Sequence, residues 1–143
     1  MGFYIIRQIA ALSLFTLSSC AVSQSSHSSN NVKIDNIHNV CTLLFNGKRF
    51  ESNLIPPCTI AVYKNKKQFA NVKGEKVYVL VGKPATAEFL SHWNVSGKDK
   101  CSDQAQGFTI ANKEIVFLSR VLKQTLICPN KYLDEKLIYT LAR

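Results

Sequence analysis

Residues 76–81 read KVYVLV, and this stretch decides the fold. Five of its six side chains are aliphatic or aromatic, and three are valine, a residue type that favours strands. A strand that is apolar without alternation is buried on both faces. Gly82 and Pro84 follow it and break the pattern. We therefore expect residues 76–81 to form a central strand.

Further strands lie on both sides of this stretch in the sequence. TIAVY at 59–63 is β-branched and aromatic, and GFTIANKEIVFL at 107–118 predicts two strands joined at Asn112-Lys113. Val32 to Leu44 alternates imperfectly and predicts one or two strands, and Asn46-Gly47 after it is a strong turn signal. Together these segments predict one mainly antiparallel sheet of about five or six strands.

Two helices complete the expected fold. Residues 86–93 predict a short helix, with Thr86 as N-cap and Glu88 in the first turn. A C-terminal helix follows Pro129, with Asp134-Glu135 in its first turn. Its apolar residues share one face (Leu133, Leu137, Ile138, Leu141). The predicted fold class is α+β: a single small domain, mainly an antiparallel sheet, with one short and one C-terminal helix.

Four cysteines in the body of the chain predict two disulfides. Cys41, Cys58, Cys101 and Cys128 are an even number, which in an oxidising compartment indicates paired thiols. Three pairings are possible. We favour Cys41–Cys58 and Cys101–Cys128, because each joins sequence neighbours within one half of the chain. The chain-entropy estimate for loops of this size is roughly 3–4 kcal/mol each.

The N-terminus is typical of an export signal. Arg7 precedes an apolar run at 9–17 that is too short to cross a bilayer. Leu17-Ser18-Ser19-Cys20 then resembles the lipobox of bacterial lipoproteins. The resemblance implies a signal peptide at 1–19 and a lipidated Cys20 that carries a diacylglycerol thioether and an N-acyl chain such as palmitate. An ordinary signal peptide, cut by chance before a cysteine, is the alternative.

The rest of the mature N-terminus predicts where the folded part begins and where the protein resides. Residues 20–31 are polar and serine-rich after Cys20, which predicts a flexible tether, and 32–143 would form the periplasmic domain. Residue 21 is Ala rather than the Asp that the lipoprotein family associates with inner-membrane retention. The resemblance thus implies the outer membrane, with its periplasmic face as the expected side and surface display left open.

Residues 101–143 also resemble the META-domain family, which includes a heat-shock lipoprotein. The residues that match its loose pattern are Cys101, Gly107, the hairpin Thr109–Ile115, Thr125, Cys128, Asp134-Glu135 and Leu141. Ser102 stands where the family often has Asn, and the family continues with further strands after the helix, beyond the point that corresponds to Arg143. The resemblance implies a small α+β domain with a sheet packed on a helix and no known catalytic residues.

The sequence favours a non-catalytic protein without cofactor or metal. No Cys-x-x-Cys occurs, and no histidine lies at ligand spacing for zinc. No Ser/His/Asp or Cys/His pattern and no glycine-rich phosphate loop occurs either. Paired carboxylates for glycoside hydrolysis stay open, because the nine acidic residues are scattered.

The basic character of the chain is the remaining functional clue. The net charge is +9, and aromatic residues (Tyr63, Phe69, Tyr78) alternate with a cluster of lysines. The lysines are Lys64, Lys66, Lys67, Lys73, Lys76 and Lys83. Such a patch favours anionic partners: anionic lipid, lipopolysaccharide or an acidic protein, with nucleic acid excluded by the compartment. Alternatively, these lysines only keep a hairpin soluble and its edges unpaired.

These observations predict a lipoprotein anchored in the outer membrane that binds or stabilises an envelope component through the lysine-rich region. Two alternative functions are compatible with the same location in the outer membrane. One is an immunity or inhibitor lipoprotein that neutralises a periplasmic toxin or hydrolase, because a rigid, disulfide-bonded binder loses little entropy on docking. The other is a pilot lipoprotein for a secretion pore.

Overall fold

The computed structural model describes residues 32–36, 39–131 and 133–143. The predicted signal peptide (1–19), Cys20 and the tether to residue 31 lie outside these residues. The elements in chain order are β1 (Lys33–Asp35), β2 (Thr42–Phe45), β3 (Lys48–Glu51), β4 (Thr59–Ile60), the 3-10 helix η1 (Lys64–Lys66), β5 (Phe69–Val72), β6 (Glu75–Val81), α1 (Ala87–His92), the 3-10 helix η2 (Gly97–Asp99), β7 (Ser102–Ala111), β8 (Glu114–Ile127) and α2 (Glu135–Leu141).

The predicted central strand is β6. It pairs with β7 along one edge, and with β5 and β4 in turn along the other. All of these pairings are antiparallel, and β8 continues the sheet beyond β7. Val77 to Val81 are all buried, as the unbroken apolar run predicted. The fold class expected from the sequence is thus confirmed.

The prediction of one sheet was wrong in detail, because the described strands form two. β1, β2 and β3 make a separate three-stranded antiparallel sheet, and the other five strands make the second. The hairpin between β2 and β3 turns at Asn46-Gly47, which both have positive φ (50° and 75°), as predicted. Nothing in a local pattern states which sheet a short strand joins, since that depends on contacts with distant residues.

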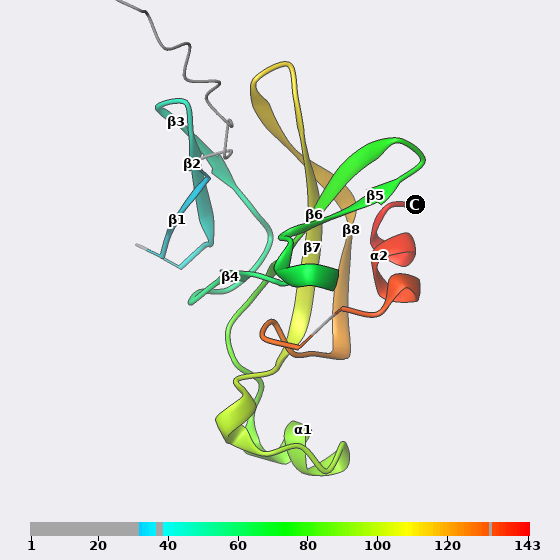
Figure 1. Cartoon of the computed structure of the whole chain (residues 1–143). Helices are drawn as coiled ribbons and strands as arrows, with labels where there is room; N and C mark the ends of the chain where they lie inside the picture. The colour runs from blue at the N-terminus through cyan, green and yellow to red at the C-terminus, as the bar shows by residue number, and fades with distance from the viewer. Residues whose placement is uncertain (1–31, 37–38, 132) are drawn as a thin grey trace, which may run out of the picture.

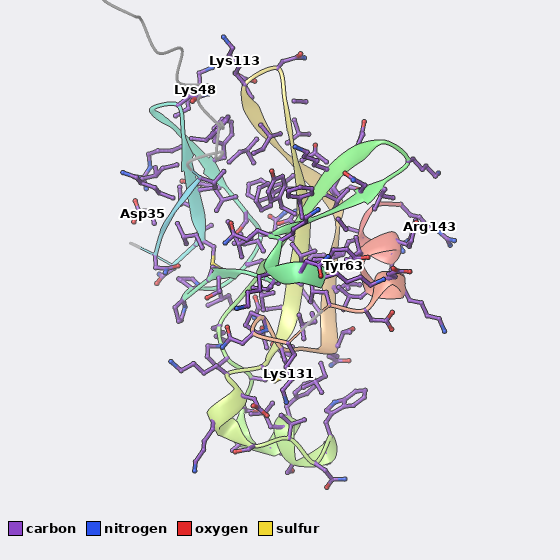
Figure 2. All side chains as sticks on the ribbon, in the orientation of Figure 1. Asp35, Lys48, Tyr63, Lys113, Lys131 and Arg143 are labelled. Atoms are coloured by element: carbon purple, nitrogen blue, oxygen red, sulfur yellow. A yellow bond between two sulfur atoms is a disulfide. The ribbon has the colours of Figure 1, made fainter. Side chains whose placement is uncertain are left out.

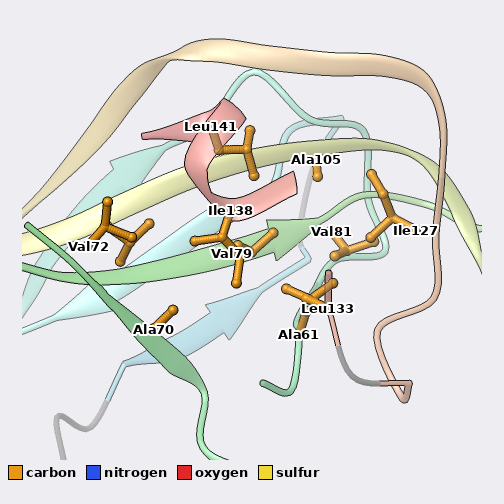
Figure 3. Close-up of a cluster of buried hydrophobic side chains, with 11 residues drawn as sticks. Ala61, Ala70, Val72, Val79, Val81, Ala105, Ile127, Leu133, Ile138 and Leu141 are labelled. Atoms are coloured by element: carbon orange, nitrogen blue, oxygen red, sulfur yellow. The ribbon is translucent and has the colours of Figure 1, made fainter. Parts of the chain in front are cut away.

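Two hydrophobic clusters lie on opposite faces of the larger sheet. On one face, Val77, Val79 and Val81 of β6 pack with Ile138 and Leu141 of α2 (Figure 3). On the other face, Tyr78 and Leu80 pack with residues of the small sheet, among them Leu43 and Phe45. The result is three layers, with the five-stranded sheet between α2 and the β1–β3 sheet (Figure 1). The alternation of β6 therefore supplies both cores at once.

The β7–β8 hairpin is confirmed at its turn but is longer than predicted. Asn112 and Lys113 have φ of 51° and 62°, the conformation of a two-residue hairpin turn. The strands run on to Ser102 and to Ile127, well beyond the expected 107–118. Two register shifts interrupt their pairing, between Ser102 and Gln104 and between Gln106 and Phe108. Such shifts break the alternation of faces, which hid the rest of the hairpin from a periodicity search.

The predicted strand at 59–63 is shorter than expected, because the chain leaves β6 after Ala61. Ala61 N–H still donates to the Val79 carbonyl at 2.9 Å. Val62 N–H instead donates to the Pro129 carbonyl at 3.0 Å, and the Val62 carbonyl accepts from Leu133 N–H at 3.3 Å. The second half of this segment therefore pairs with the chain that leads into α2, and so ties the C-terminal helix to the sheet.

α1 begins where the sequence predicted, whereas α2 begins at Glu135, so that Asp134 is its N-cap and Leu133 precedes the helix. The Thr86 hydroxyl accepts a hydrogen bond from Phe89 N–H at 3.2 Å and caps α1. The Asp134 carboxylate accepts from Lys136 N–H at 3.0 Å and caps α2. α1 extends away from both sheets (Figure 1), whereas α2 lies on the larger one. Among the described residues, no helix has the length and apolar character needed to cross a membrane.

The two disulfides join Cys41 to Cys58 and Cys101 to Cys128, which confirms the favoured pairing. The first joins the residue before β2 to the residue before β4, and so encloses the β2–β3 hairpin and the segment that leads from it to β4. The second links the start of β7 to the end of β8, at the base of the segment that holds α1. Each disulfide restricts the conformations of the unfolded chain, which on the chain-entropy estimate stabilises the folded state by roughly 3–4 kcal/mol. Both bonds and both hydrophobic clusters lie among the described residues of the 32–143 segment.

We expect Phe108→Ala to destabilise the protein by about 3–5 kcal/mol. Phe108 is fully buried and its ring packs between Tyr78 and Phe117, so truncation leaves a cavity that the sheet cannot close. Urea unfolding followed by circular dichroism measures the loss. Val116→Ala is the matched control, because Val116 is 48% exposed on β8 and should change stability by about 0.5 kcal/mol or less. Equal losses in the two variants would contradict this placement of the core.

Candidate anion-binding surface

The six lysines that are close in sequence are divided by the structure. Lys67 and Lys76 lie together against one aromatic ring, and Lys64 contacts α2 instead. Lys73 is in the turn between β5 and β6. Lys83 follows the opposite end of β6, about 23 Å along an extended chain from Lys76. The structure therefore does not bring Lys83 together with Lys67 and Lys76.

Phe69 organises the central part of this surface. The Lys76 ammonium nitrogen lies 4.8 Å from the centroid of the Phe69 ring, and that of Lys67 lies 5.9 Å from it. Both distances are within the range of a cation–π contact. Lys67 and Lys76 are exposed and Phe69 is half-buried, so both ammonium groups remain open to solvent. We call these three residues the Phe69 cluster.

The Phe69 ring is held by a row of aromatic rings that crosses the sheet. Phe69 pairs with Tyr78, Tyr78 with Phe108 and Phe108 with Phe117, so the four rings lie on one face of four adjacent strands. Neighbouring ring centroids are 5.8, 5.0 and 6.0 Å apart. Because this row joins the edge strand β5 to the buried core, the Phe69 cluster rests on a rigid support.

Lys64 belongs to a second group on the α2 side. The Tyr63 hydroxyl donates to Oε1 of Glu135 at 2.9 Å, and the Lys64 ammonium donates to the same oxygen. Figure 2 shows Tyr63 beside α2. The hydrogen bond from Lys64, and to a smaller extent that from Tyr63, holds the pKa of Glu135 below its ordinary value. The same hydrogen bonds raise the pKa of Lys64 and of Tyr63, because the carboxylate favours their protonated forms.

The other lysines on this side of the protein form no ion pair with an acidic residue in the described part of the chain. The ion pairs there are Lys48–Glu114, Arg49–Asp35, Lys64–Glu135 and Lys131–Asp99. None of these pairs includes Lys66, Lys67, Lys73 or Lys76, all of which are exposed. We call these four lysines, with Phe69, the basic surface. It lines β5, an edge strand whose one partner among the described strands is β6. The chemistry it offers is attraction of anions by ammonium groups next to an aromatic ring.

The remaining predicted site residues have structural roles or lie outside the described chain. Cys41, Cys58, Cys101 and Cys128 are in disulfides, and Cys20 is not among the described residues. Within residues 32–36, 39–131 and 133–143, no three His, Cys, Asp or Glu side chains lie close enough together to hold a metal ion.

One feature of the surface was missed from sequence. An open cleft of about 540 Å³ lies between the 53–55 loop and the adjoining ends of β7 and β8. Its lining residues are Asn53, Ile55, Asp103, Gln104, Lys123 and Gln124. These residues come from three segments far apart in the chain, and scattered amide residues give no sequence signal of their own.

We expect Glu135→Gln to lower the pKa of Tyr63 toward its ordinary value, because the carboxylate that favours the protonated phenol is removed. The folded-state pKa of Glu135 is lowered, so its stabilising effect is present above its unfolded pKa and is lost as pH falls through the folded pKa. Wild type should therefore exceed the variant in unfolding free energy at neutral pH, and the two should converge in acid.

The measurements are a tyrosine NMR titration and urea unfolding across the pH range. Glu51→Gln is the control, because Glu51 is an exposed acid on β3 that is in none of the four ion pairs of the described chain. A Tyr63 titration that is the same in wild type and Glu135→Gln would show that the Tyr63–Glu135 contact is absent in solution.

Comparisons with known proteins give this chain no family. No family model matches it, and neither a curated protein nor a solved structure does. The resemblances to lipoproteins and to the META domain therefore stay predictions. A functional proposal for this protein has to rest on its own residues.

Proposed function

We propose that this protein is a non-catalytic lipoprotein, anchored in the outer membrane through Cys20, whose domain binds an anionic envelope component through the basic surface. The observation that carries the proposal is the Phe69 cluster, in which two lysines that have no acidic partner among the described residues share one ring. The predicted export signal and the lipobox-like Leu17-Ser18-Ser19-Cys20 support the proposed anchoring in the outer membrane.

The physical basis is the unrelieved repulsion between neighbouring cations. Lys66 and Lys67 are adjacent in the chain, and the ammonium groups of Lys67 and Lys76 both lie near the Phe69 ring, 5.9 and 4.8 Å from its centroid. The ring quadrupole offsets part of this repulsion. An anion bound next to these ammonium groups would reduce the remaining repulsion between them. The aromatic row keeps the ring in place, which limits the ordering that a ligand has to impose.

The ligand class is a surface or polymer that carries phosphates or carboxylates. Lipopolysaccharide, anionic phospholipid and an acidic protein all present such groups in the envelope, and a surface of exposed lysines attracts all three. The attraction between exposed charges is screened within about 10 Å at 0.1 M salt. Binding through this surface should therefore weaken as salt is added, whichever anion is bound.

We expect Lys67→Gln/Lys76→Gln to weaken binding to anionic vesicles, by about fivefold for each lysine. Residues 32–143 without lipid are mixed with phosphatidylcholine vesicles, with or without phosphatidylglycerol, and separately with lipopolysaccharide. Sedimentation at low and high salt measures the bound fraction. Lys98→Gln/Lys113→Gln is the matched control, because it removes the same charge from exposed sites on η2 and on the β7–β8 turn.

Two results would contradict the proposal. The first is the absence of binding to phosphatidylglycerol vesicles and lipopolysaccharide at low salt. The second is equal weakening by both double variants, which would mean that net charge rather than the Phe69 cluster causes the binding. Preference for lipopolysaccharide over phosphatidylglycerol, or the reverse, would identify the ligand within the proposed class.

A second candidate function is favoured by the α1 lobe, residues 84–100. Trp93 is 51% exposed there and contacts Phe89, with ring centroids 6.4 Å apart. The lobe projects from the sheets (Figure 1), and an ion pair between Lys131 and Asp99, 3.0 Å long, braces its base. Exposed tryptophan is enriched among the residues that dominate protein interfaces. This supports an immunity, inhibitor or pilot role, in which the partner is a protein.

We expect Trp93→Ala to abolish capture of such a partner from envelope extracts if this second function is correct, because a large apolar contact is lost. Tyr139→Ala is the control, since Tyr139 is similarly exposed (49%) on α2. A captured toxin or hydrolase would identify an immunity or inhibitor protein, and a secretion-pore subunit would identify a pilot. Undiminished capture by Trp93→Ala would exclude the α1 lobe as the contact.

A further inference from the structure

The cleft beside the 53–55 loop has the construction of a binding site. Its wall is attached to β7 by two glutamine side chains. The Gln106 Oε1 accepts from Asn53 N–H and the Gln104 Oε1 accepts from Ile55 N–H, both at 3.0 Å. The loop is therefore held at a set distance from the sheet by side chains rather than by strand pairing.

These two glutamines are themselves immobilised. Gln106 is 1% exposed, and its Nε2 donates to the Leu118 carbonyl at 3.0 Å. Gln104 lies over Gly82, where an added Cβ would come within 2.6 Å of its side chain. Gln104 can approach the backbone this closely only because residue 82 is glycine. A cleft whose wall is held in this way is preorganised for a ligand.

A β-bulge directs adjacent residues into the same cleft. Neighbours along a regular strand point to opposite faces. Asp103 and Gln104 of β7 nevertheless both line the cleft, and so do Lys123 and Gln124 of β8. The register shift between Ser102 and Gln104 lies here, and Gln124 has a positive φ of 55°. Bulges are over-represented beside functional sites, where they re-aim side chains.

Most polar side chains directed into the cleft are available to a ligand. No hydrogen bond or ion pair within the described chain involves the side chains of Asn53, Asp103, Lys123 or Gln124. The lining carries one acid and one base, and is otherwise made of three amides and the half-exposed Ile55. Its net charge is zero, in contrast to the basic surface on β5. A ligand of strong charge of either sign would meet a like charge here.

We propose that this cleft binds a neutral oligosaccharide. The amides can donate to and accept from neighbouring hydroxyls, the Asp103 carboxylate can accept from them, and Ile55 offers an apolar contact for the C–H face of a sugar ring. A volume of about 540 Å³ lies within the usual range for small-molecule sites. This surface is separate from the basic surface, and the inference does not rest on the proposed function.

Extended peptides are a poorer fit to the same cleft. Peptides that add to a sheet use the free backbone N–H and C=O groups of an edge. The backbone N–H groups of Asn53 and Ile55 are already occupied by Gln106 and Gln104. The groups left over are side-chain amides, a carboxylate and an ammonium, which suit separate hydroxyls better than a continuous backbone ladder.

The test is NMR shift mapping and calorimetry on the full chain in lauryldimethylamine oxide micelles, a detergent without a sugar headgroup. The probes are tetra-N-acetylchitotetraose, cellotetraose and maltotetraose, with tetraalanine and inorganic phosphate for comparison. We expect at least one tetrasaccharide to shift the amide signals of Asn53, Ile55, Gln104 and Gln124, with a Kd on the order of 1 mM or tighter.

Variants assign the contact to the cleft. Asn53→Ala and Asp103→Ala should each weaken tetrasaccharide binding about fivefold, because each removes hydrogen bonds to the ligand. Asn71→Ala is the matched control, since it removes the same amide from exposed β5, and it should leave binding unchanged.

Three results would overturn the proposal: no tetrasaccharide shifts these signals, tetraalanine or phosphate alone shifts them, or Asn71→Ala weakens binding as much as Asn53→Ala. The shift map of the unaltered protein decides the matter even if a variant does not fold. Loss of vesicle binding in Lys67→Gln/Lys76→Gln concerns the other surface and leaves this result unaffected.

Discussion

Burial of β6 on both faces is the interaction on which the rest of the structure depends. A strand with one apolar face needs one covering layer, whereas the valines of β6 and its Tyr78 and Leu80 need two. α2 covers the valine face and the small β1–β3 sheet covers the other. Without either layer, one of the two hydrophobic clusters would be exposed to water, at a cost of roughly 25 cal/mol per Å² of apolar surface. The three-layer arrangement follows from that one strand.

The same register that builds the core positions the two candidate surfaces. Cross-strand pairing sets Phe69, Tyr78, Phe108 and Phe117 in one row, so the core continues without a break to the edge where Lys67 and Lys76 lie. Farther along β7, the register shifts and turns polar side chains toward the loop at 53–55. Regular pairing thus supports the basic surface, and interrupted pairing forms the cleft.

Disulfides and side-chain hydrogen bonds hold the segments that lie outside the hydrophobic core. The Cys41–Cys58 disulfide closes the loop that contains residues 53–55, and two glutamines of β7 fasten that loop to the sheet. The Cys101–Cys128 disulfide holds the base of the α1 lobe. A small domain buries a limited fraction of its surface, so such ties supply rigidity where packing is thin. Each proposed contact surface lies beside one of these ties or on the aromatic row.

The sequence by itself determined the central strand, the turns at Asn46-Gly47 and Asn112-Lys113, the start of α1 at Thr86, and the pairing of each cysteine with its neighbour in the sequence. Each of these depends on local chemistry: unbroken apolarity, tolerance of positive φ, or a side chain that caps its own helix. Only the tertiary structure decided that there are two sheets among the described strands and that Lys83 is separate from Lys67. It also decided that Gln106 reaches Asn53 across 53 positions of sequence. These features depend on register and on bulges between distant strands, and a one-residue change of register moves every side chain to the other face.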